Sequence, residues 1–264
     1  MFDNHLERWR LSPDGDPLIT RTTALLPVRR DGQPAMLKVA LHKEERHGAQ
    51  LMAWWDGQGA ARVLAQSGDA ILMERADRTP SLAELARSGR DDEATRIICA
   101  TVARLHASRP SPRPGLVALT QWFAALEPAA NAQGGILRAA AKAASDLLAT
   151  PCDTVVLHGD IHHGNILHFG TRGWLAIDPK GLVGERAFDY ANLFCNPDLR
   201  IAAAPGRLAQ RVGIVADAAA LDRIRLLRWV LAWAGLSAAF AIEDGLPPQG
   251  ALEIAELAAA ELGR

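Results

Sequence analysis

The sequence predicts an α+β fold, in which a small antiparallel sheet with one helix precedes a larger and mostly helical part. Strand and turn signals fill residues 1–75, whereas helical patterns dominate residues 76–264. A short region of strands and turns returns at 154–177 inside the helical part. A chain of 264 residues can bury a substantial core, either as one domain or as two lobes. We therefore expect two lobes that meet near Arg75.

The N-terminal part begins with a predicted hairpin. Segments 24–30 and 35–41 flank Asp31 and Gly32, a pair typical of tight β-turns, and Lys38 lies on the second strand. A helix is expected over 42–55, where Gly57 stops it. Two more short strands at 62–65 and 70–74 complete a small antiparallel sheet.

Helices are expected in most of the remaining chain. The acidic run 91–93 suits a helix N-terminus, because the helix dipole favours negative charge there. Further helices are predicted at 119–127, at 135–149 and from Arg186 onward. The strongly apolar stretch 226–242 follows several arginines and is rich in alanine, so we expect a buried helix and not a membrane span.

Composition and charge exclude several classes of partner. The net charge is -1, so no global field favours nucleic acid or an anionic membrane. The three cysteines are widely spaced, which argues against a disulfide framework and suits a reducing compartment. The N-terminus offers no apolar leader segment. We therefore expect a cytoplasmic protein.

Residues 158–165, HGDIHHGN, and residues 177–179, IDP, carry the strongest chemical signal. Asn165 and Asp178 flank a predicted hairpin, where their oxygens suit Mg²⁺. Asp160 lies five residues before Asn165, on the loop entering that hairpin, and can face an acceptor hydroxyl. Phosphoryl transfer needs a metal, positioning and a proton acceptor. The three residues therefore indicate a phosphoryl-transfer site.

The same motifs resemble those of the aminoglycoside phosphotransferase superfamily, which is related to the protein kinases. The longer run LHGDIHHGNILHFGTRGWLAIDPKGLVGERAFDYANLFCNPD is similar to the streptomycin 6-phosphotransferase and hydroxyurea phosphotransferase branch. The resemblance implies a bilobal protein-kinase-like fold, ATP and Mg²⁺, and a small cationic substrate. It further implies phosphorylation of streptomycin at its 6-hydroxyl, as antibiotic resistance.

The resemblance also implies roles for individual residues. Asp160 matches the catalytic base, and Asn165 and Asp178 match the magnesium ligands. Lys38 matches the lysine that contacts the α- and β-phosphates of the nucleotide. Glu45 matches the glutamate that orients this lysine, with Glu44 as the adjacent contender.

Other residues are expected to contact the nucleotide or to support the catalytic loop. The segment MERA, which contains Glu74 and Ala76, matches the hinge that pairs with adenine through backbone groups. His158 and His162 are expected to support the catalytic loop, and His163 to face solvent. Asp189 could cap a helix, but the resemblance favours a brace for the catalytic loop.

The substrate-binding residues are the least determined. Glu185 and Asp198 are candidates for a cation-binding rim, together with Glu243 and Asp244. Fold and catalytic loop do not fix a substrate, so a kinase for another small alcohol or for hydroxyurea stays open.

Two alternatives of another class also stay open. The histidine cluster could bind zinc, although its order, H-x-D-x-H-H, differs from the H-x-H-x-D-H run of metallo-hydrolases. A silent nucleotide-binding protein is the second alternative. The presence of the lysine, both aspartates and the asparagine argues against it.

Overall fold

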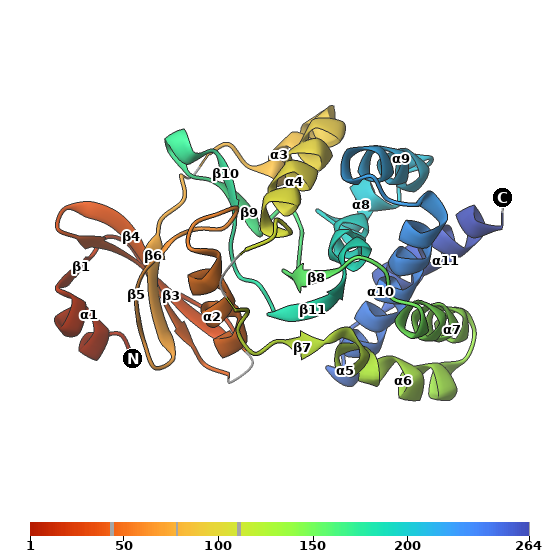
Figure 1. Ribbon diagram of the computed structural model, residues 1–264, viewed down its shortest axis with the longest axis horizontal. Helices are drawn as coiled ribbons and strands as arrows, with labels where there is room; N and C mark the ends of the chain where they lie inside the picture. The colour runs from red at the N-terminus through yellow and green to blue at the C-terminus, as the bar shows by residue number, and fades with distance from the viewer. Residues whose placement is uncertain (43–44, 78, 110–111, 264) are drawn as a thin grey trace.

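The N-terminal part of the chain folds into a six-stranded sheet, on the left of Figure 1. The computed structural model describes residues 1–42, 45–77, 79–109 and 112–263, apart from the side chains of Glu45 and Arg46. Strand order is β1-β3-β4-β6-β5, with β2 paired to β3 and every neighbouring pair antiparallel. The elements are α1 (Asp3–Trp9), β1 (Leu11–Pro13), β2 (Leu18–Ile19), β3 (Thr23–Arg30), β4 (Gln33–Ala40), α2 (Glu45–Trp55), β5 (Val63–Ser67) and β6 (Ala70–Glu74).

The predicted hairpin is confirmed as the pair β3 and β4. Arg30 lies opposite Gln33, so Asp31 and Gly32 form the two-residue turn between them. Both turn residues have positive φ, 50° and 75°, which the twist of a tight hairpin requires and glycine adopts without strain. The antiparallel sheet predicted from the sequence is therefore present, and its last strand ends one residue before Arg75.

Alternation along β4 sends its side chains to the two faces of the sheet. Leu37 and Val39 belong to a small core on one face, against which Phe2 and Leu6 from the region of α1 pack. Lys38 lies between them in sequence and therefore points to the opposite face, where α2 lies. The period of two thus places this lysine on the side of the sheet that faces the helical part (Figure 1).

The C-terminal part is mostly helical and surrounds α10 (Arg223–Glu243) (Figure 1). By length and apolar composition α10 could cross a membrane, but the helix is largely buried inside the protein, as the sequence predicts. Its Gly235 lies so close to Ala140 that an added Cβ would be 2.3 Å from the alanine methyl group. The other elements are α3 (Leu82–Leu85), η1 (Ala86–Arg90), α4 (Asp91–Leu105), β7 (Val117–Ala118), α5 (Leu119–Trp122), η2 (Phe123–Ala125), α6 (Leu126–Gln133), α7 (Ile136–Ala149), β8 (Thr154–Leu157), β9 (Ile166–His168), η3 (Gly170–Arg172), β10 (Trp174–Ala176), β11 (Leu182–Glu185), η4 (Arg186–Cys195), α8 (Leu199–Ala202), α9 (Arg207–Ala219) and α11 (Gln249–Leu262).

The predicted strands at 154–177 are confirmed, but they have a partner that the sequence did not reveal. β9 and β10 form the expected antiparallel hairpin. β8 instead pairs with β11, which also pairs with β7 in a separate three-stranded sheet. The strand β11 is only four residues long, and β7 only two, so neither carries a readable periodicity.

Helix α2 lies directly against the loop that follows β10. The backbone of Gly48 approaches the carbonyl oxygen of Pro179 so closely that an added Cβ would be 2.1 Å from it. Gly181, with φ at 72°, likewise leaves room for His47, whose Cβ would be 2.8 Å from an added methyl group. Two glycines therefore allow backbone-to-backbone packing between α2 and the segment that contains Asp178.

This packing makes Gly48→Ala a test of the contact. The new methyl group must displace the carbonyl of Pro179, so we expect the free energy of unfolding to fall by about 1–3 kcal/mol, as overpacking does. We also expect the KM for ATP to rise, because Pro179 follows Asp178. Chemical denaturation and steady-state kinetics measure the two effects.

Gly213→Ala in α9 is the matched control for this prediction. An added Cβ there meets its nearest neighbour at 3.5 Å, an ordinary contact. Alanine is the better helix former, so we expect stability to rise by up to about 1 kcal/mol with unchanged kinetics. Equal behaviour of the two variants would contradict the close contact at Gly48.

Candidate active site

The catalytic-loop motif lies between the separate sheet and the β9–β10 hairpin. Residues 158–165 connect β8 to β9, and the backbone of Ile177 donates a hydrogen bond to the carbonyl of Asn165 at 2.9 Å. This bond closes the open end of the hairpin, with Asn165 just before β9 and Asp178 just after β10. The hairpin therefore brings together two residues that the sequence separates.

The carboxylate of Asp160 is held by side-chain amides at both oxygens. Asn165 Nδ2 donates to the Asp160 carbonyl at 2.9 Å and to Oδ2 at 3.2 Å. Asn192 Nδ2 donates to Oδ1 at 2.7 Å. The cationic Nζ of Lys180 is farther away, at 4.0 Å from Oδ2. Asp160 is thus oriented mainly by neutral donors.

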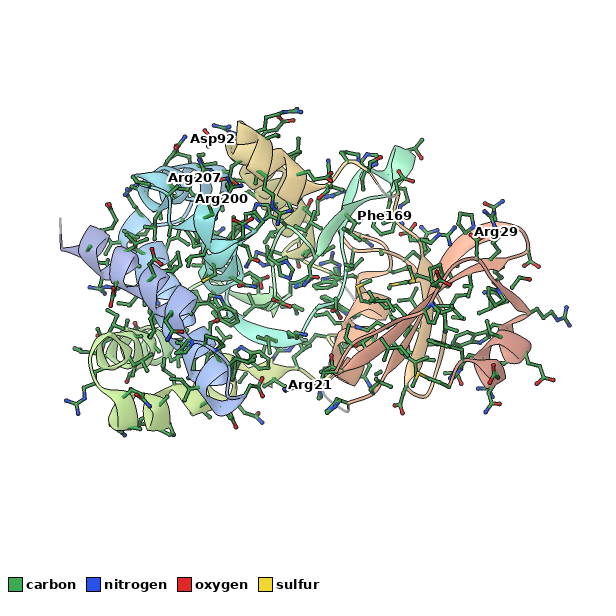
Figure 2. All side chains as sticks on the ribbon, turned by 180° about the vertical axis from the view of Figure 1, so that it is seen from behind. Arg21, Arg29, Asp92, Phe169, Arg200 and Arg207 are labelled. Atoms are coloured by element: carbon green, nitrogen blue, oxygen red, sulfur yellow. The ribbon has the colours of Figure 1, made fainter. Side chains whose placement is uncertain are left out.

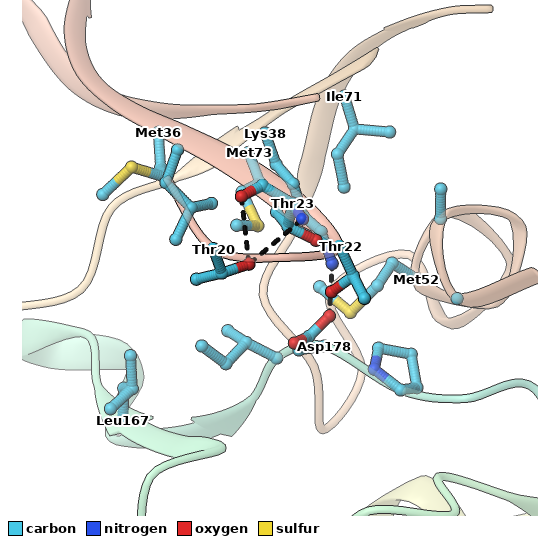
Figure 3. A pocket seen from close by; sticks show the side chains of 15 residues that line it. Thr20, Thr22, Thr23, Met36, Lys38, Met52, Ile71, Met73, Leu167 and Asp178 are labelled. Carbon is cyan, nitrogen blue, oxygen red and sulfur yellow. Dashed lines mark hydrogen bonds and ion pairs between the residues drawn. The ribbon is translucent and has the colours of Figure 1, made fainter. Parts of the chain in front are cut away.

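Asp178, in contrast, forms a direct ion pair with Lys38 of β4 (Figure 3). Burial acts to raise the pKa of Asp178, but Lys38 and then Lys180 outweigh it and hold the pKa below its usual value. The backbone of Asp178 has φ at 61°, a left-handed conformation that residues other than glycine rarely adopt. Strained backbone of this kind is frequent at functional sites, where the surrounding structure enforces it.

His158 is buried and connects the catalytic loop to the segment after β10. Its Nδ1 accepts a hydrogen bond from the Asp160 backbone at 3.2 Å, so the opposite nitrogen, Nε2, carries the proton and donates to the carbonyl of Ile177 at 2.8 Å. Burial lowers the pKa of His158, against the opposing effect of nearby Asp189. A neutral imidazole of defined tautomer therefore bridges the segments that carry Asp160 and Asp178.

Asp189 lies inside η4 and accepts backbone hydrogen bonds from the start of the catalytic loop. Its Oδ2 and Oδ1 accept from His158 at 2.9 Å and from Gly159 at 2.6 Å. His106 Nε2 of the segment after α4 lies 2.8 Å from Oδ2. Burial would raise the pKa of Asp189, but these hydrogen bonds, led by that of His106, lower it overall.

The two other histidines of the motif differ in environment. The Nδ1 atom of His162 accepts from the Gly164 backbone at 3.0 Å, within the turn of the loop. The expectation that His163 faces solvent is wrong, because its side chain is buried and its Nε2 lies 3.4 Å from Asp91. Burial, followed by the charge of Arg211, lowers the pKa of His163 to about 3.

Asp91 belongs to a charged network that fastens α4 to α9. Arg211 forms a two-pronged pair with the Asp91 carboxylate, at 2.9 Å for the closest atoms, and also donates to the carbonyls of Leu193 and Asn196. Arg207 contacts both Asp91 and Asp92, and Figure 2 shows Arg207 beside Asp92 at this crossing. The acidic start of α4 therefore has specific partners in addition to the helix dipole.

A cavity of about 230 Å³ lies between the six-stranded sheet and the β9–β10 hairpin (Figure 3). Its lining is mostly apolar, and Lys38 and Asp178 lie at its polar edge. Thr20 and Thr23 close a tight turn beside them, in which the Thr23 backbone donates to the Thr20 hydroxyl at 3.1 Å. The apolar lining residues are Leu25, Met36, Ala49, Met52, Ile71, Met73, Leu167, Ile177 and Pro179.

The hinge after β6 is fastened to the C-terminal part by its acidic side chains. The carboxylate of Glu74 accepts from the Arg62 backbone at 2.6 Å and pairs with Arg172 of η3. The Oδ2 atom of Asp77 accepts from the Gly170 backbone at 2.8 Å. The same oxygen lies 3.0 Å from Nδ1 of His168. The Glu74 side chain is therefore occupied within the fold, which leaves the backbone as its means of contacting a nucleotide.

Ala76 lies between these two acidic residues. Within the described ranges, its backbone amide donates no hydrogen bond to another backbone group. Glu45 is the first residue of α2, but its side chain and the whole of Glu44 lie outside the described residues.

The expectation that Glu185 binds substrate is not supported by its surroundings. The Glu185 side chain is buried, and it accepts from Arg225 through both oxygens at 2.6 Å and from the indole of Trp229 at 2.9 Å. A carboxylate with this many internal donors has little capacity left for a ligand. Asp198 is more accessible; it caps α8 through the Ile201 backbone and pairs with Arg87 at 2.9 Å.

The donor set at the hairpin fits Mg²⁺. Asn165 uses its amide nitrogen toward Asp160, so its oxygen is the atom directed elsewhere, and Asp178 contributes a carboxylate. Magnesium takes one or two oxygens from protein and the rest from phosphates and water. In the part of the chain that the structure describes, no three His, Cys, Asp or Glu side chains gather closely enough to hold a metal. The zinc alternative therefore lacks a ligand set there.

Sequence reasoning missed Asn192, although a local signal existed. The segment η4 is a 3₁₀-helix, in which residues three apart lie on the same side. Asn192 follows Asp189 by three residues, so both side chains reach the catalytic loop. The cavity lining is different, because its apolar residues come from separate strands and only the fold brings them together.

The sheet-and-helix architecture, the apolar cavity, and the carboxylates of Asp160 and Asp178 define a kinase-like phosphotransferase. A family model described as aminoglycoside/hydroxyurea antibiotic resistance kinase matches residues 8–245, and the chain belongs to this family. Streptomycin 3″-kinase of Klebsiella pneumoniae is 54% identical over 245 residues, which is 91% of this chain and 92% of that protein. Streptomycin 6-kinase of Streptomyces griseus is 34% identical over 257 residues, or 91% of this chain and 82% of that protein.

Solved structures show the same fold. A thermostable mutant of aminoglycoside phosphotransferase APH(4)-Ia superposes with a TM-score of 0.69 at 14% identity, covering 100% of both chains. Another structure of that enzyme contains ADP and hygromycin B; it superposes with a TM-score of 0.64 at 13% identity, over 99% of this chain and 96% of the other. The predicted bilobal, protein-kinase-like fold is thereby confirmed. The chain is an ATP-dependent phosphotransferase.

The hydrogen bonds of Asp189 predict that its neutral analogue destabilises the protein. Asp189→Asn leaves buried donors facing an amide, so we expect a loss of about 3–5 kcal/mol in the free energy of unfolding at pH 7. Because the pKa of Asp189 is lowered in the folded protein, the carboxylate contributes fully to stability at pH values above its ordinary pKa of 3.8. This stabilisation is lost as the pH falls through the lowered pKa. The difference in the free energy of unfolding between wild type and variant should therefore stay constant above about pH 4 and become smaller below it.

Urea denaturation at a series of pH values measures this difference. Asp146→Asn is the control, since Asp146 is an exposed residue of α7 that pairs with Lys142. Such surface pairs contribute about 0–1 kcal/mol. A variant of Asp189 as stable as this control would contradict the role of the buried carboxylate.

Proposed function

We propose that this chain transfers the γ-phosphoryl group of ATP to a hydroxyl of streptomycin and thereby inactivates the antibiotic. The observation that carries the proposal is the 54% identity to a streptomycin 3″-kinase over 91% of this chain. A second relative at 34% identity is also a streptomycin kinase. ATP as co-substrate implies that the reaction takes place in the cytoplasm.

In this proposal, the nucleotide base occupies the apolar cavity beside Met73, and the backbone amide of Ala76 is a donor for the adenine ring. Lys38 lies at the polar edge of the cavity and would contact the α- and β-phosphates. Asn165 and Asp178 would hold Mg²⁺, which neutralises charge on the phosphates when bound. The ion pair between Lys38 and Asp178 holds both charged groups at the edge of the cavity where we place the phosphates.

Asp160 would then accept the proton of the attacking hydroxyl. Its carboxylate is oriented by neutral amide donors, and no cation contacts it as closely as these amides do. The carboxylate can therefore act as a base. His158 and Asp189 would fix the backbone on either side of it, and His162 would shape the turn that follows.

The relatives support two acceptor positions on streptomycin. The relative at 54% identity supports the 3″-hydroxyl, and the one at 34% supports the 6-hydroxyl that the sequence resemblance implied. We favour the 3″-hydroxyl, because the first relative shares far more of this chain's residues. Streptomycin carries guanidinium groups that carboxylates bind well, and Asp198 is the half-exposed candidate for one of them.

Incubation with ATP, Mg²⁺ and streptomycin tests the substrate. We expect ADP release that depends on streptomycin, and a phosphate on the 3″-oxygen when the product is analysed by phosphorus–proton NMR. A phosphate on the 6-oxygen would move the proposal to the second candidate. Turnover with hydroxyurea or another aminoglycoside, and none with streptomycin, would contradict the proposal.

Two substitutions separate the proposed base from the proposed metal ligand. Asp160→Asn should lower kcat by about 10²–10⁴-fold and leave Mg²⁺–ATP binding nearly unchanged, because a general base acts only in the chemical step. Asp178→Ala should weaken nucleotide binding mainly when Mg²⁺ is present. Steady-state kinetics and calorimetric titration with ATP, with and without Mg²⁺, measure these effects.

Asp217→Ala, at an exposed position of α9, is the control for both substitutions. It removes the same charge far from the motif in sequence and should change neither kcat nor nucleotide affinity. Unchanged turnover in Asp160→Asn would refute the base, and unchanged Mg²⁺ dependence in Asp178→Ala would refute the metal ligand.

A further inference from the structure

The amide of Asn192 is fixed in one orientation by a neighbour that can only donate. The indole Nε1 of Trp233, on α10, donates to Asn192 Oδ1 at 3.0 Å. An indole has no acceptor on its nitrogen, so the amide oxygen must face Trp233. Asn196 Nδ2 donates to the same oxygen at 3.2 Å, which agrees with this orientation.

With its oxygen held, Asn192 must present its Nδ2 group to Asp160. That nitrogen lies 2.7 Å from Asp160 Oδ1, one of the shorter contacts in the site. The second oxygen of Asp160 receives Asn165 Nδ2 at 3.2 Å. Two amides from different segments, one before β9 and one in η4, therefore hold the two carboxylate oxygens and fix the plane of the group.

The donors closest to Asp160 are neutral, which matters for a group that must accept a proton. An ion pair would orient the carboxylate but also compete with the acceptor hydroxyl for it. The ammonium group of Lys180 is more distant, with its Nζ 4.0 Å from Oδ2, and the Nε2 atom of His162 lies 3.9 Å from Oδ1. Orientation without neutralisation is thus the specific contribution of the amides.

We propose that Asn192 is a positioning residue for phosphoryl transfer, and that Trp233 sets its orientation. It aims the Asp160 carboxylate at the acceptor hydroxyl and contributes nothing to nucleotide binding, since it does not line the cavity beside Lys38. This inference rests on the proposed role of Asp160 as base. It extends the site from the catalytic loop to η4 and to the central helix α10.

Asn192→Asp separates positioning from packing. Aspartate has the same size and still accepts from Trp233, but while ionised it cannot donate to Asp160 and it repels that carboxylate. We expect kcat with streptomycin to fall about 10–100-fold, as displacement of a catalytic group does, with the KM for ATP within about twofold of wild type. Asn192→Ala should show the same division between kcat and KM, together with a lower Tm.

The matched control is Asn131→Asp, the same change at an exposed position of α6. It should leave kcat, KM and Tm unchanged. A wild-type kcat in folded Asn192→Asp and Asn192→Ala would overturn the proposal, because a residue that only packs would alter stability and not turnover.

The variants Trp233→Phe and Asp160→Asn distinguish the remaining outcomes. If both Asn192 variants fail to fold, Trp233→Phe decides, because it removes the donor that orients Asn192. A kcat about 3–30-fold lower with unchanged KM for ATP would support the proposal, and a wild-type kcat would overturn it. If Asp160→Asn retains wild-type turnover, the proposed base is wrong; if it is inactive and the Asn192 variants are not, only this inference is wrong.

Discussion

A single buried carboxylate supports the backbone of the loop to which we assign the chemistry of this protein. Asp189 accepts from the amides of His158 and Gly159 at the entrance of the catalytic loop, and His106 supports it from behind. His158 in turn links this loop to the carbonyl of Ile177, one residue before Asp178. The bonds from His158 and Gly159 to Asp189 are buried, where an unmatched polar group is costly, so the loop has little freedom to adopt another course.

The two functional carboxylates are held by different kinds of partner, and the difference matches their proposed roles. Asp178 faces Lys38, so positive charge stabilises it as an anion at the edge of the cavity. Asp160 faces amides, which direct it without balancing its charge. A metal ligand benefits from being permanently ionised, whereas a base must keep its affinity for a proton. Similar side chains are thus directed to different chemistry by their neighbours.

Local patterns predicted those parts of the structure that are encoded within a few residues. The β3–β4 hairpin and the flanking positions of Asn165 and Asp178 follow from turn residues and from the motif. The continuous helix predicted over 119–127 is instead divided into α5, η2 and α6. The burial of Glu185 was not predictable, because its partners Arg225 and Trp229 lie about forty residues away in sequence. Long-range partners of this kind carry no local signal.

The lining of the cavity that we propose for the nucleotide has a consequence for inhibition. Three of its apolar residues are methionines, Met36, Met52 and Met73, contributed by two strands and by α2. Methionine side chains are unbranched and polarizable, so they reshape around ligands at low energetic cost. Compounds that compete with ATP here would find an adaptable wall and gain affinity easily, but they would gain little selectivity from shape. Selective inhibitors would have to exploit the fixed polar edge at Lys38, where geometry is enforced by charge.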